Sequence, residues 1–423
     1  MKTMTALAFS ACAAAAFADP SVTIDTIAQT GRTVTVCYTL SNEPAVITFG
    51  VETNAGNGLW LPVGGSQVRR VAGKVNRRMA TGSYSFKWIA DENWLAEAVG
   101  AGEARAVVRA WALDNPPDYV MFNLMGFTTT SKHHSVLFYE SLDHFPFPIS
   151  DDRYKRYWYV MRRIPAKDVV WRMGSPTGES GRQSGETPHY VKLTQDYYIG
   201  VYLFSEAHYA QYTTIHEQKD YGSGKVMTSP TQAARGYMGY NNVRGSAEDY
   251  VWPESGHSVD PDKILGKLRA AFPGYDFDLA TSAQWEFACR AGTGTRYYWG
   301  DAAANLSDPD DVFFQYAWKT YVNVEVGLKK PNAFGLYDMI GLTREICLDW
   351  FETKYAEASD PEHPIEDPKG PATADHASNL RTPRGVSSTA ETYMRTAMRL
   401  WDEAPSRNAG DTGLRPVIPA VVP

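Results

Sequence analysis

The chain has 423 residues, of which 43% are hydrophobic and 21% are charged. This composition predicts two or three folded domains, and it excludes a single small module and a largely disordered chain. The 41 Lys and Arg residues are outnumbered by 48 Asp and Glu residues, which gives a formal net charge of −7. Because no positive field is available to attract a polyanion, we do not expect nucleic acid as a partner.

Residues 1–18 have the pattern of a secretory signal peptide. Lys2 precedes an apolar, alanine-rich stretch, and Ala16-Phe17-Ala18 forms a small-x-small cleavage site. We therefore expect an exported protein, periplasmic or extracellular, whose mature form begins at Asp19. An alternative interpretation is a lipoprotein signal with the lipid on Cys12. No stretch is long and apolar enough to span a bilayer, so no transmembrane segment is expected.

Residues 19–117 are expected to form a β-sandwich of the immunoglobulin or fibronectin type. Apolar and polar residues alternate over residues 33–40, 45–51 and 84–88, and turn-rich spacers separate these runs. A period of two is typical of strands with one buried face. Nothing in this region carries a catalytic pattern, so it is interpreted as a spacer or docking module.

Residues 118–152 are interpreted as a transition segment, and residues 153–423 as a second domain with short strands and few helices. Its clearest helix begins after Thr281, where Gln284 completes the spacing of a capping box. Trp285, Ala288 and Cys289 then fall on one face, and Gly292 ends the helix. Strands followed by such a mixed region predict an α+β chain.

Three cysteines remain after the signal peptide, namely Cys37, Cys289 and Cys347. An odd number allows at most one intramolecular disulfide, and Cys289 with Cys347 is the expected pair because both fall in the C-terminal region. The alternative, two separate thiols packed as small hydrophobic side chains, is left open.

Five sequence blocks follow one another in the second region. They are Arg163-Ile164-Pro165-Ala166 with Met173-Gly174-Ser175-Pro176, Glu179, Arg182, Glu186 and Pro188-His189; residues 198–202; residues 279–293; residues 331–339 with Gly341 and Glu345; and Arg384-Gly385 with Ser387, Arg395, Ala397, Arg399 and Gly413-Leu414-Arg415. Together they resemble the formylglycine-generating enzymes, also called sulfatase-modifying factors. The resemblance implies an irregular, C-type-lectin-like domain.

The catalytic members of that family oxidise a substrate cysteine with molecular oxygen and a copper ion held by two cysteines of the closing block. Here residues 384–395 contain no cysteine, and none follows Cys347. Soft Cu(I) selects thiolate ligands, so copper is not expected. The sequence therefore favours a non-catalytic member, a pseudoenzyme. The alternative is an oxygen-dependent enzyme that generates formylglycine on sulfatases with other ligands.

The resemblance also implies a groove that receives a peptide, here lined differently. A secreted or envelope protein, a peptide or a glycan is the expected partner. The expected lining residues are Ser387, Ser388, Thr392 and Tyr393, with Trp318 and Trp401 as walls.

Calcium is the one cofactor that the resemblance leaves open. The family's Gly-Asn-x-x-Glu block keeps Gly341 and Glu345 here, but Leu342 replaces the amide. Oxygen-rich ligands suit this hard cation. The candidate ligands are Asn305, Asp308, Asp310, Asp311 and Glu345. A solvated acidic loop is the alternative interpretation of this cluster.

The retained charged residues of the second region are interpreted as structural. Buried ion pairs can fasten irregular segments that lack regular hydrogen-bond ladders. The residues expected in such a network are Glu286, Asp338, Arg395, Arg399 and Arg415.

Overall fold

The computed structural model describes residues 18–92, 99, 102–125, 135–212, 229–234, 238–246, 258–302, 304–319, 324–352, 360–371, 380–386, 388, 390–399 and 411–423. Most of the expected signal peptide, with Cys12, lies outside these residues. The chain divides into two compact units. The first unit comprises Met1–Pro62 and Arg70–Leu113, and the second comprises Val63–Arg69 and Asp114–Pro423. No helix within the described ranges has both the length and the apolar character needed to cross a membrane.

The first unit consists of two antiparallel sheets. One has the order β1 (Ser21–Thr30), β2 (Thr33–Ser41), β7 (Gly82–Ile89) and β5 (Val71–Gly73). The other has the order β4 (Trp60–Pro62), β3 (Ala45–Asn54) and β6 (Arg77–Met79), with β8 (Ala104–Trp111) also paired to β3. Phe49 of β3 and Phe86 of β7 have ring centroids 4.7 Å apart, so the apolar faces of the two sheets meet. In β2 every second residue is buried, as the alternation predicts.

The second unit begins earlier than the sequence suggests. The segment interpreted as a transition, residues 118–152, instead contributes β9 (Tyr119–Asn123) and β10 (Val136–Tyr139), followed by η1 (Leu142–His144). These strands belong to a six-stranded sheet of order β10, β9, β11 (Trp158–Ile164), β14 (Tyr197–Gly200), β20 (Pro416–Pro419) and β15 (Asp278–Leu279). The first four residues of β9 are buried, and this explains why they join the sheet rather than form a linker. The segment Val63–Arg69, with α1 (Gly65–Val68), also belongs to this unit.

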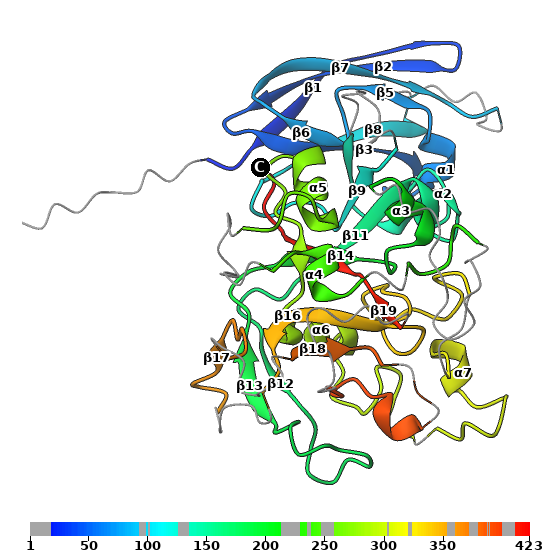
Figure 1. Ribbon diagram of the computed structural model, residues 1–423. Coiled ribbons are helices and arrows are strands. Elements are labelled where there is room, and N and C mark those ends of the chain that lie inside the picture. Colours follow the sequence, from blue (N-terminus) through cyan, green and yellow to red (C-terminus); the bar gives the residue numbers. More distant parts are fainter. Residues whose placement is uncertain are drawn as a thin grey trace, which may run out of the picture. The chain divides into compact units, whose positions relative to one another are not determined.

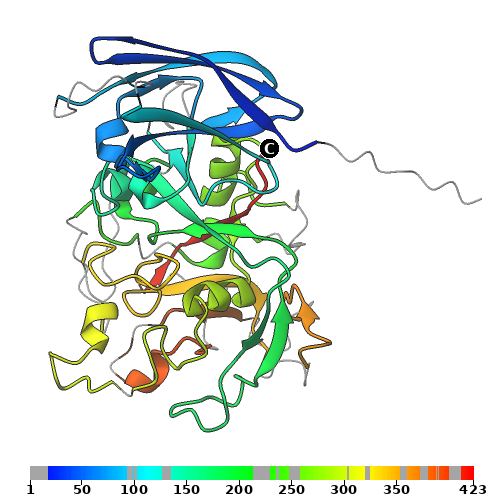
Figure 2. The same ribbon diagram turned by 180° about the vertical axis from the view of Figure 1, so that it is seen from behind.

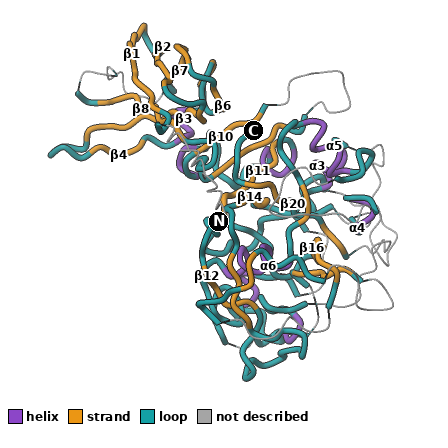
Figure 3. Tube along the Cα trace, turned by 90° about the vertical axis from the view of Figure 1, so that its left-hand side faces the viewer, coloured by secondary structure: helices purple, strands orange, loops and turns teal. Residues whose placement is uncertain are grey.

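Two smaller sheets complete the second unit. One joins β12 (Val170–Met173), β13 (His189–Lys192) and β17 (Ile365–Glu366), and the other joins β18 (Arg381–Arg384), β16 (Arg344–Trp350) and β19 (Thr412–Gly413). The short helices are α2 (Arg153–Arg156), α3 (Glu206–Ala210), α4 (Tyr240–Val243), α5 (Ile264–Ala271), α6 (Ser282–Arg290), α7 (Phe313–Tyr316) and η2 (Glu391–Tyr393). Long loops connect them (Figure 3). The fold is α+β, with more strands than helices among the described residues.

Helix α6 is the central helix of the second unit and lies against β16 (Figures 1 and 2). The predicted capping box is confirmed: Gln284 N donates to Thr281 Oγ1 at 3.1 Å, and Thr281 N donates to Gln284 Oε1 at 2.9 Å. Ala291 ends the helix in the left-handed conformation, and Gly292 follows with a φ of 89°. All nine helical residues are buried, so α6 is enclosed by the segments around it.

Candidate functional site

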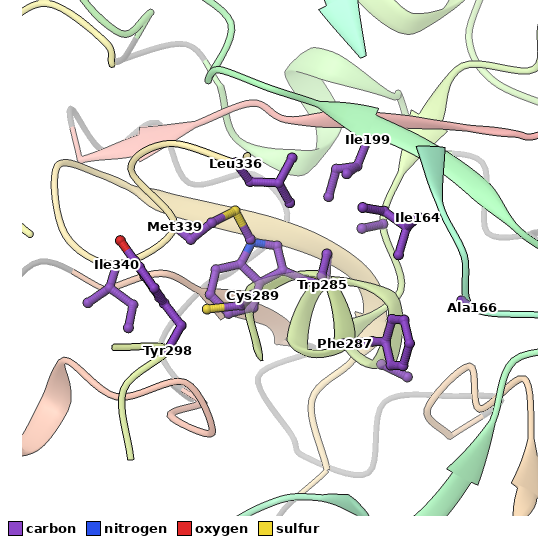
Figure 4. Packing of buried hydrophobic residues seen from close by; sticks show 14 of the residues in the cluster. Ile164, Ala166, Ile199, Trp285, Phe287, Cys289, Tyr298, Leu336, Met339 and Ile340 are labelled. Carbon is purple, nitrogen blue, oxygen red and sulfur yellow. The ribbon is translucent and has the colours of Figure 1, made fainter. Parts of the chain in front are cut away.

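The site suggested by the sequence is built around α6 and the closing segment, residues 384–399. Trp285 lies in the apolar core around α6, with Leu336, Met339 and Ile199 in the same cluster (Figure 4). The closing segment starts against this core, because a Cβ on Gly385 would lie 3.1 Å from both Trp285 Cζ2 and Met339 O. Gly385 adopts a φ of 68°, a conformation that glycine reaches without strain.

Glu286, in the middle of α6, fastens two other segments to the helix. Its Oε1 accepts from Arg290 Nε and from Gly174 N, both at 2.9 Å, and its Oε2 lies 2.9 Å from Arg384 Nη1. Burial acts to raise the pKa of Glu286, but the two guanidinium groups outweigh it and hold that pKa below its usual value. Arg384 also donates to Ser282 Oγ at 2.7 Å, so β18 is fastened to the start of the helix.

Glu345 is not placed to act as the calcium ligand that the sequence suggested. Its Oε2 accepts from Arg415 Nε at 2.9 Å and from Trp285 Nε1 at 2.8 Å, and its Oε1 accepts from Arg415 Nη2 at 3.0 Å. The carboxylate is therefore occupied by an arginine and an indole. This ion pair ties the C-terminal segment to α6 and β16.

Arg395 is held by a loop that precedes it by about two hundred residues. Its Nη1 lies 2.5 Å from Glu179 Oε1, and its Nη2 lies 2.6 Å from Glu186 Oε1 and 2.7 Å from Gly181 O. Its Nε donates to Thr392 O at 2.7 Å. We call this arrangement of Glu179, Gly181 and Glu186 on Arg395 the clasp. It fastens the closing segment with two carboxylates on one guanidinium group.

The other expected members of the charge network make different contacts. Arg399 donates to Gly185 O at 2.9 Å and to Glu352 O at 3.1 Å. Asp338 accepts from Gly327 N at 2.6 Å, and no arginine in the described part of the chain forms an ion pair with it. The network therefore consists of separate clusters, on Glu286, Glu345 and Arg395.

The residues expected to line a groove fall into three groups. Ser387 and Trp401 lie outside the described residues. Thr392 is half-buried against the clasp, because a Cβ on Gly181 would lie 2.7 Å from Thr392 Cβ. Ser388 accepts from Ala390 N at 3.1 Å, and Tyr393 is 42% exposed.

Trp318 lies near the start of the closing segment. A Cβ on Gly341 would lie 2.5 Å from Trp318 O, and Gly341 N donates to Gly385 O at 3.2 Å. The Lys329 ammonium lies 3.9 Å from the centroid of the Trp318 ring. Gly341 therefore contacts both Trp318 and the beginning of the closing segment.

The acidic loop uses its side chains to cap its own backbone. Asp311 Oδ2 accepts from Asn305 N at 2.9 Å, and Asp308 Oδ1 accepts from Asp310 N at 3.0 Å. Lys319 Nζ donates to Leu306 O at 2.9 Å. Within the described ranges, no group of three or more His, Cys, Asp or Glu side chains is arranged to hold a metal ion. These side chains are engaged with the loop's own backbone, and calcium binding by the loop stays a prediction.

The expected disulfide is not formed. Cys289 of α6 and Cys347 of β16 are separate, buried thiols in the core around α6. Burial raises the pKa of both thiols, so both are protonated at neutral pH. They pack as small hydrophobic side chains, which is the alternative that the sequence left open.

The donor set does not fit the copper centre that the family resemblance implies. The implied centre holds Cu(I) with two thiolates, whereas Cys289 and Cys347 are enclosed in an apolar core and no cysteine follows Cys347. The third cysteine after residue 18, Cys37, lies in β2 of the first unit.

Sequence reasoning missed the acidic partners of the arginines. Glu179 and Glu186 were recognised as parts of blocks but not as partners of Arg395, and Arg384 was not recognised as a partner of Glu286. The only available signal was an acidic residue retained in a loop. Its partner lies 216 residues away for Glu179 and 209 for Glu186, a separation at which sequence pattern does not indicate contact.

The comparisons with known proteins agree with this architecture. Residues 165–420 match the model of the sulfatase-modifying factor enzyme 1-like domain. A formylglycine-generating enzyme of Streptomyces coelicolor is 27% identical over 249 residues, which cover 50% of this chain and 74% of that protein. One from Thermomonospora curvata is 30% identical over 150 residues, covering 32% of this chain and 48% of that protein. One from Mus musculus is 23% identical over 256 residues, covering 51% of this chain and 63% of that protein. This chain belongs to the sulfatase-modifying factor enzyme 1-like family.

Proposed function

We propose that this chain is an exported, non-catalytic member of its family that binds a peptide segment of a secreted or envelope protein. One observation carries the proposal: the closing segment has no cysteine, and the two thiols of the second unit are buried and protonated. Without thiolates, the copper-dependent oxidation that the family resemblance implies has no copper ligands of the expected kind. A binding role does not require them.

The way in which the closing segment is fastened supports a retained binding surface. Gly341 and Gly385 hold its start beside Trp318, and the clasp holds Arg395. Arg395 lies between two carboxylates, and charge-assisted hydrogen bonds of this kind fix geometry without a metal ion. Tyr393 lies between these two anchors and is exposed, as an aromatic contact residue would be.

Export rests on the signal-peptide pattern of residues 1–18. Expression of the full chain in a bacterial host with a periplasm tests it. N-terminal sequencing of the periplasmic protein should begin at Asp19. Cytoplasmic retention of the uncut chain would contradict export, and a lipid attached to Cys12 would favour the lipoprotein interpretation.

Binding is tested with the mature chain on arrays of immobilised peptides and glycans. We expect a subset of peptides to bind, and Tyr393→Ala to weaken their binding at least about fivefold, the effect of losing an aromatic contact. Tyr157→Ala is the matched control, because Tyr157 is 37% exposed and lies at the end of α2. Equal binding by the two variants would contradict the assignment, and binding of glycans alone would replace the peptide with a sugar.

The enzymatic alternative is favoured by the name of all three relatives. It is tested by incubating the mature chain with Cu(I), oxygen and a cysteine-containing peptide. We expect no oxygen uptake and no aldehyde on the peptide. Turnover to an aldehyde would contradict the non-catalytic role.

A further inference from the structure

Residues 324–330, here called the strap, cross the surface directly above a buried carboxyl group. Val326 N donates to Thr231 O at 3.0 Å, and Lys330 N donates to Gln315 O at 2.8 Å. Between these anchors, Gly327 N donates to Asp338 Oδ2 at 2.6 Å. Leu328 is 53% exposed on the outside of the strap, whereas Asp338 is 0% exposed beneath it. The strap therefore separates Asp338 from solvent.

The interactions of the Asp338 carboxyl group do not fully compensate for its burial. Its Oδ1 is buried and has no hydrogen-bond partner among the residues that the structure describes, and its backbone adopts a φ of 56°. Burial raises the pKa of Asp338 to about 6, and the Gly327 amide opposes this only in part. The charged and titratable groups that interact with Asp338 are Arg415, Glu345, Lys155, Lys329, Tyr202, Tyr298 and Tyr337.

We propose that the strap is a proton-controlled cover over Asp338, closed when this carboxyl group is protonated and loosened when it is ionised. The fold supplies the geometry, a surface segment bonded to a buried acid that has one unpaired oxygen. The protonation state of Asp338 determines the free energy of the closed arrangement.

The direction of the effect follows from two opposed terms. Opening the strap breaks the bond from Gly327, which favours the closed form of the ionised acid. Opening also lets water reach the carboxylate, which favours the open form. Burial outweighs the Gly327 bond in its effect on the pKa of Asp338, so ionisation favours opening. If opening restores the ordinary pKa of 3.8, the opening equilibrium rises by up to about a hundredfold between pH 4 and pH 7.

The strap also carries Lys329, which stacks on Trp318 and donates to Phe314 O. Burial lowers the pKa of Lys329, and the Asp338 carboxylate acts in the opposite direction, so the two groups are electrostatically coupled. This step rests on the proposed function: where Trp318 is a wall of the binding surface, loosening the strap displaces Lys329 and weakens ligand binding as the pH rises through about 6.

Hydrogen exchange read by mass spectrometry tests the cover without any ligand, so its outcome is independent of the proposed function. After correction for intrinsic rates, peptides of residues 324–330 should exchange faster at pH 7 than at pH 5, with a midpoint near 6. Peptides of β11, in the six-stranded sheet, should show no such change.

Two variants distinguish an effect of Asp338 on the strap from a general loosening of the second unit. Asp338→Asn cannot ionise, and Asn tolerates a positive φ, so the strap should stay protected at both pH values. Asp349→Asn removes another buried acid with a pKa raised to about 6, and the strap should keep the pH dependence of the unmodified chain. Strap exchange that does not depend on pH, dependence that survives Asp338→Asn, or dependence lost in Asp349→Asn would overturn the proposal. If Asp338→Asn does not fold, strap exchange that is independent of pH in the unmodified chain, or pH dependence lost in Asp349→Asn, would still overturn the proposal.

Discussion

Each of the two units of this chain is stabilised internally by a different kind of interaction. Within its described residues, the first unit buries apolar side chains and a single polar one, Thr48. The second unit buries a large set of arginines among its described residues: Arg244, Arg290, Arg296, Arg344, Arg381, Arg384, Arg395, Arg399 and Arg415. Hydrogen-bonded ladders join the strands of the first unit, whereas charged side chains join the loops of the second.

The difference shows what an irregular fold requires. A sheet satisfies its backbone groups internally and needs only an apolar face to pack. Loops leave backbone carbonyls that need other donors, and an arginine has five N–H groups to offer. Arg415 donates to Gly200 O, Val201 O and Tyr337 O in addition to Glu345. Buried arginines therefore supply donors to the loops of the second unit, beside the ladders of its three sheets.

The largest expected effect comes from removing a buried arginine. Arg395→Met leaves Glu179 and Glu186 without their cation, and stranding a buried charge costs about 3 to 5 kcal/mol of unfolding free energy. Arg105→Met is the matched change in the first unit, where Arg105 is 49% exposed in its pair with Glu52. An exposed pair contributes at most about 1 kcal/mol. Urea denaturation of each variant measures the difference, and equal losses would break the comparison between the units.

A smaller effect is expected from the pH dependence of the second unit. Asp349 Oδ2 accepts from Ser282 N at 2.6 Å, and burial raises the pKa of Asp349 to about 6. The folded pKa lies above the unfolded value, so the contribution of this group is complete below pH 3.8 and is lost as the pH rises through about 6. Relative to Asp349→Asn, the unmodified chain should lose about 2 to 3 kcal/mol between pH 4 and pH 7.

Parallel urea titrations of the two proteins at several pH values measure this loss. A constant difference between them would show that Asp349 has no raised pKa. No carboxylate is buried among the described residues of the first unit, so the sandwich should not contribute to the dependence.

The smallest effect concerns the loop of the clasp. Gly181 has a φ of 80°, and a Cβ there would lie 2.7 Å from Thr392 Cβ, so Gly181→Ala should cost about 1 to 3 kcal/mol. Gly178 lies in the same loop with no atom within 4 Å of its Cβ position, and Gly178→Ala should change the free energy by less than about 0.5 kcal/mol. Thermal unfolding compares the two, and a harmless Gly181→Ala would mean that the loop does not press on Thr392.

The sequence predicts much of the local structure and little of the long-range pairing. The strands of the sandwich follow from the alternation of residues 33–40, and α6 follows from Thr281 and Gln284, because both signals are local. The extent of the second unit was missed, because nothing local shows that β9 pairs with β11.

The candidate site could be predicted only in part. Arg395, Arg415 and Glu286 were expected in buried pairs, and each makes one. Glu345 was expected to be a calcium ligand. Its position beside Arg415 depends on how the C-terminal segment returns to the core, which the sequence pattern does not show. The same topology places Cys289 and Cys347 in one core without a bond, an outcome that cysteine counting does not decide.

The central claim is that this chain keeps the family's architecture without a thiolate copper site. An anaerobic titration of the reduced protein, residues 19–423, with Cu(I) in competition with a chromophoric chelator tests it most directly. We predict that the chelator retains the copper and that Cys289→Ala and Cys347→Ala leave the titration unchanged, because both thiols are buried and protonated. Transfer of one equivalent of Cu(I) to the protein, abolished by either substitution, would contradict the account.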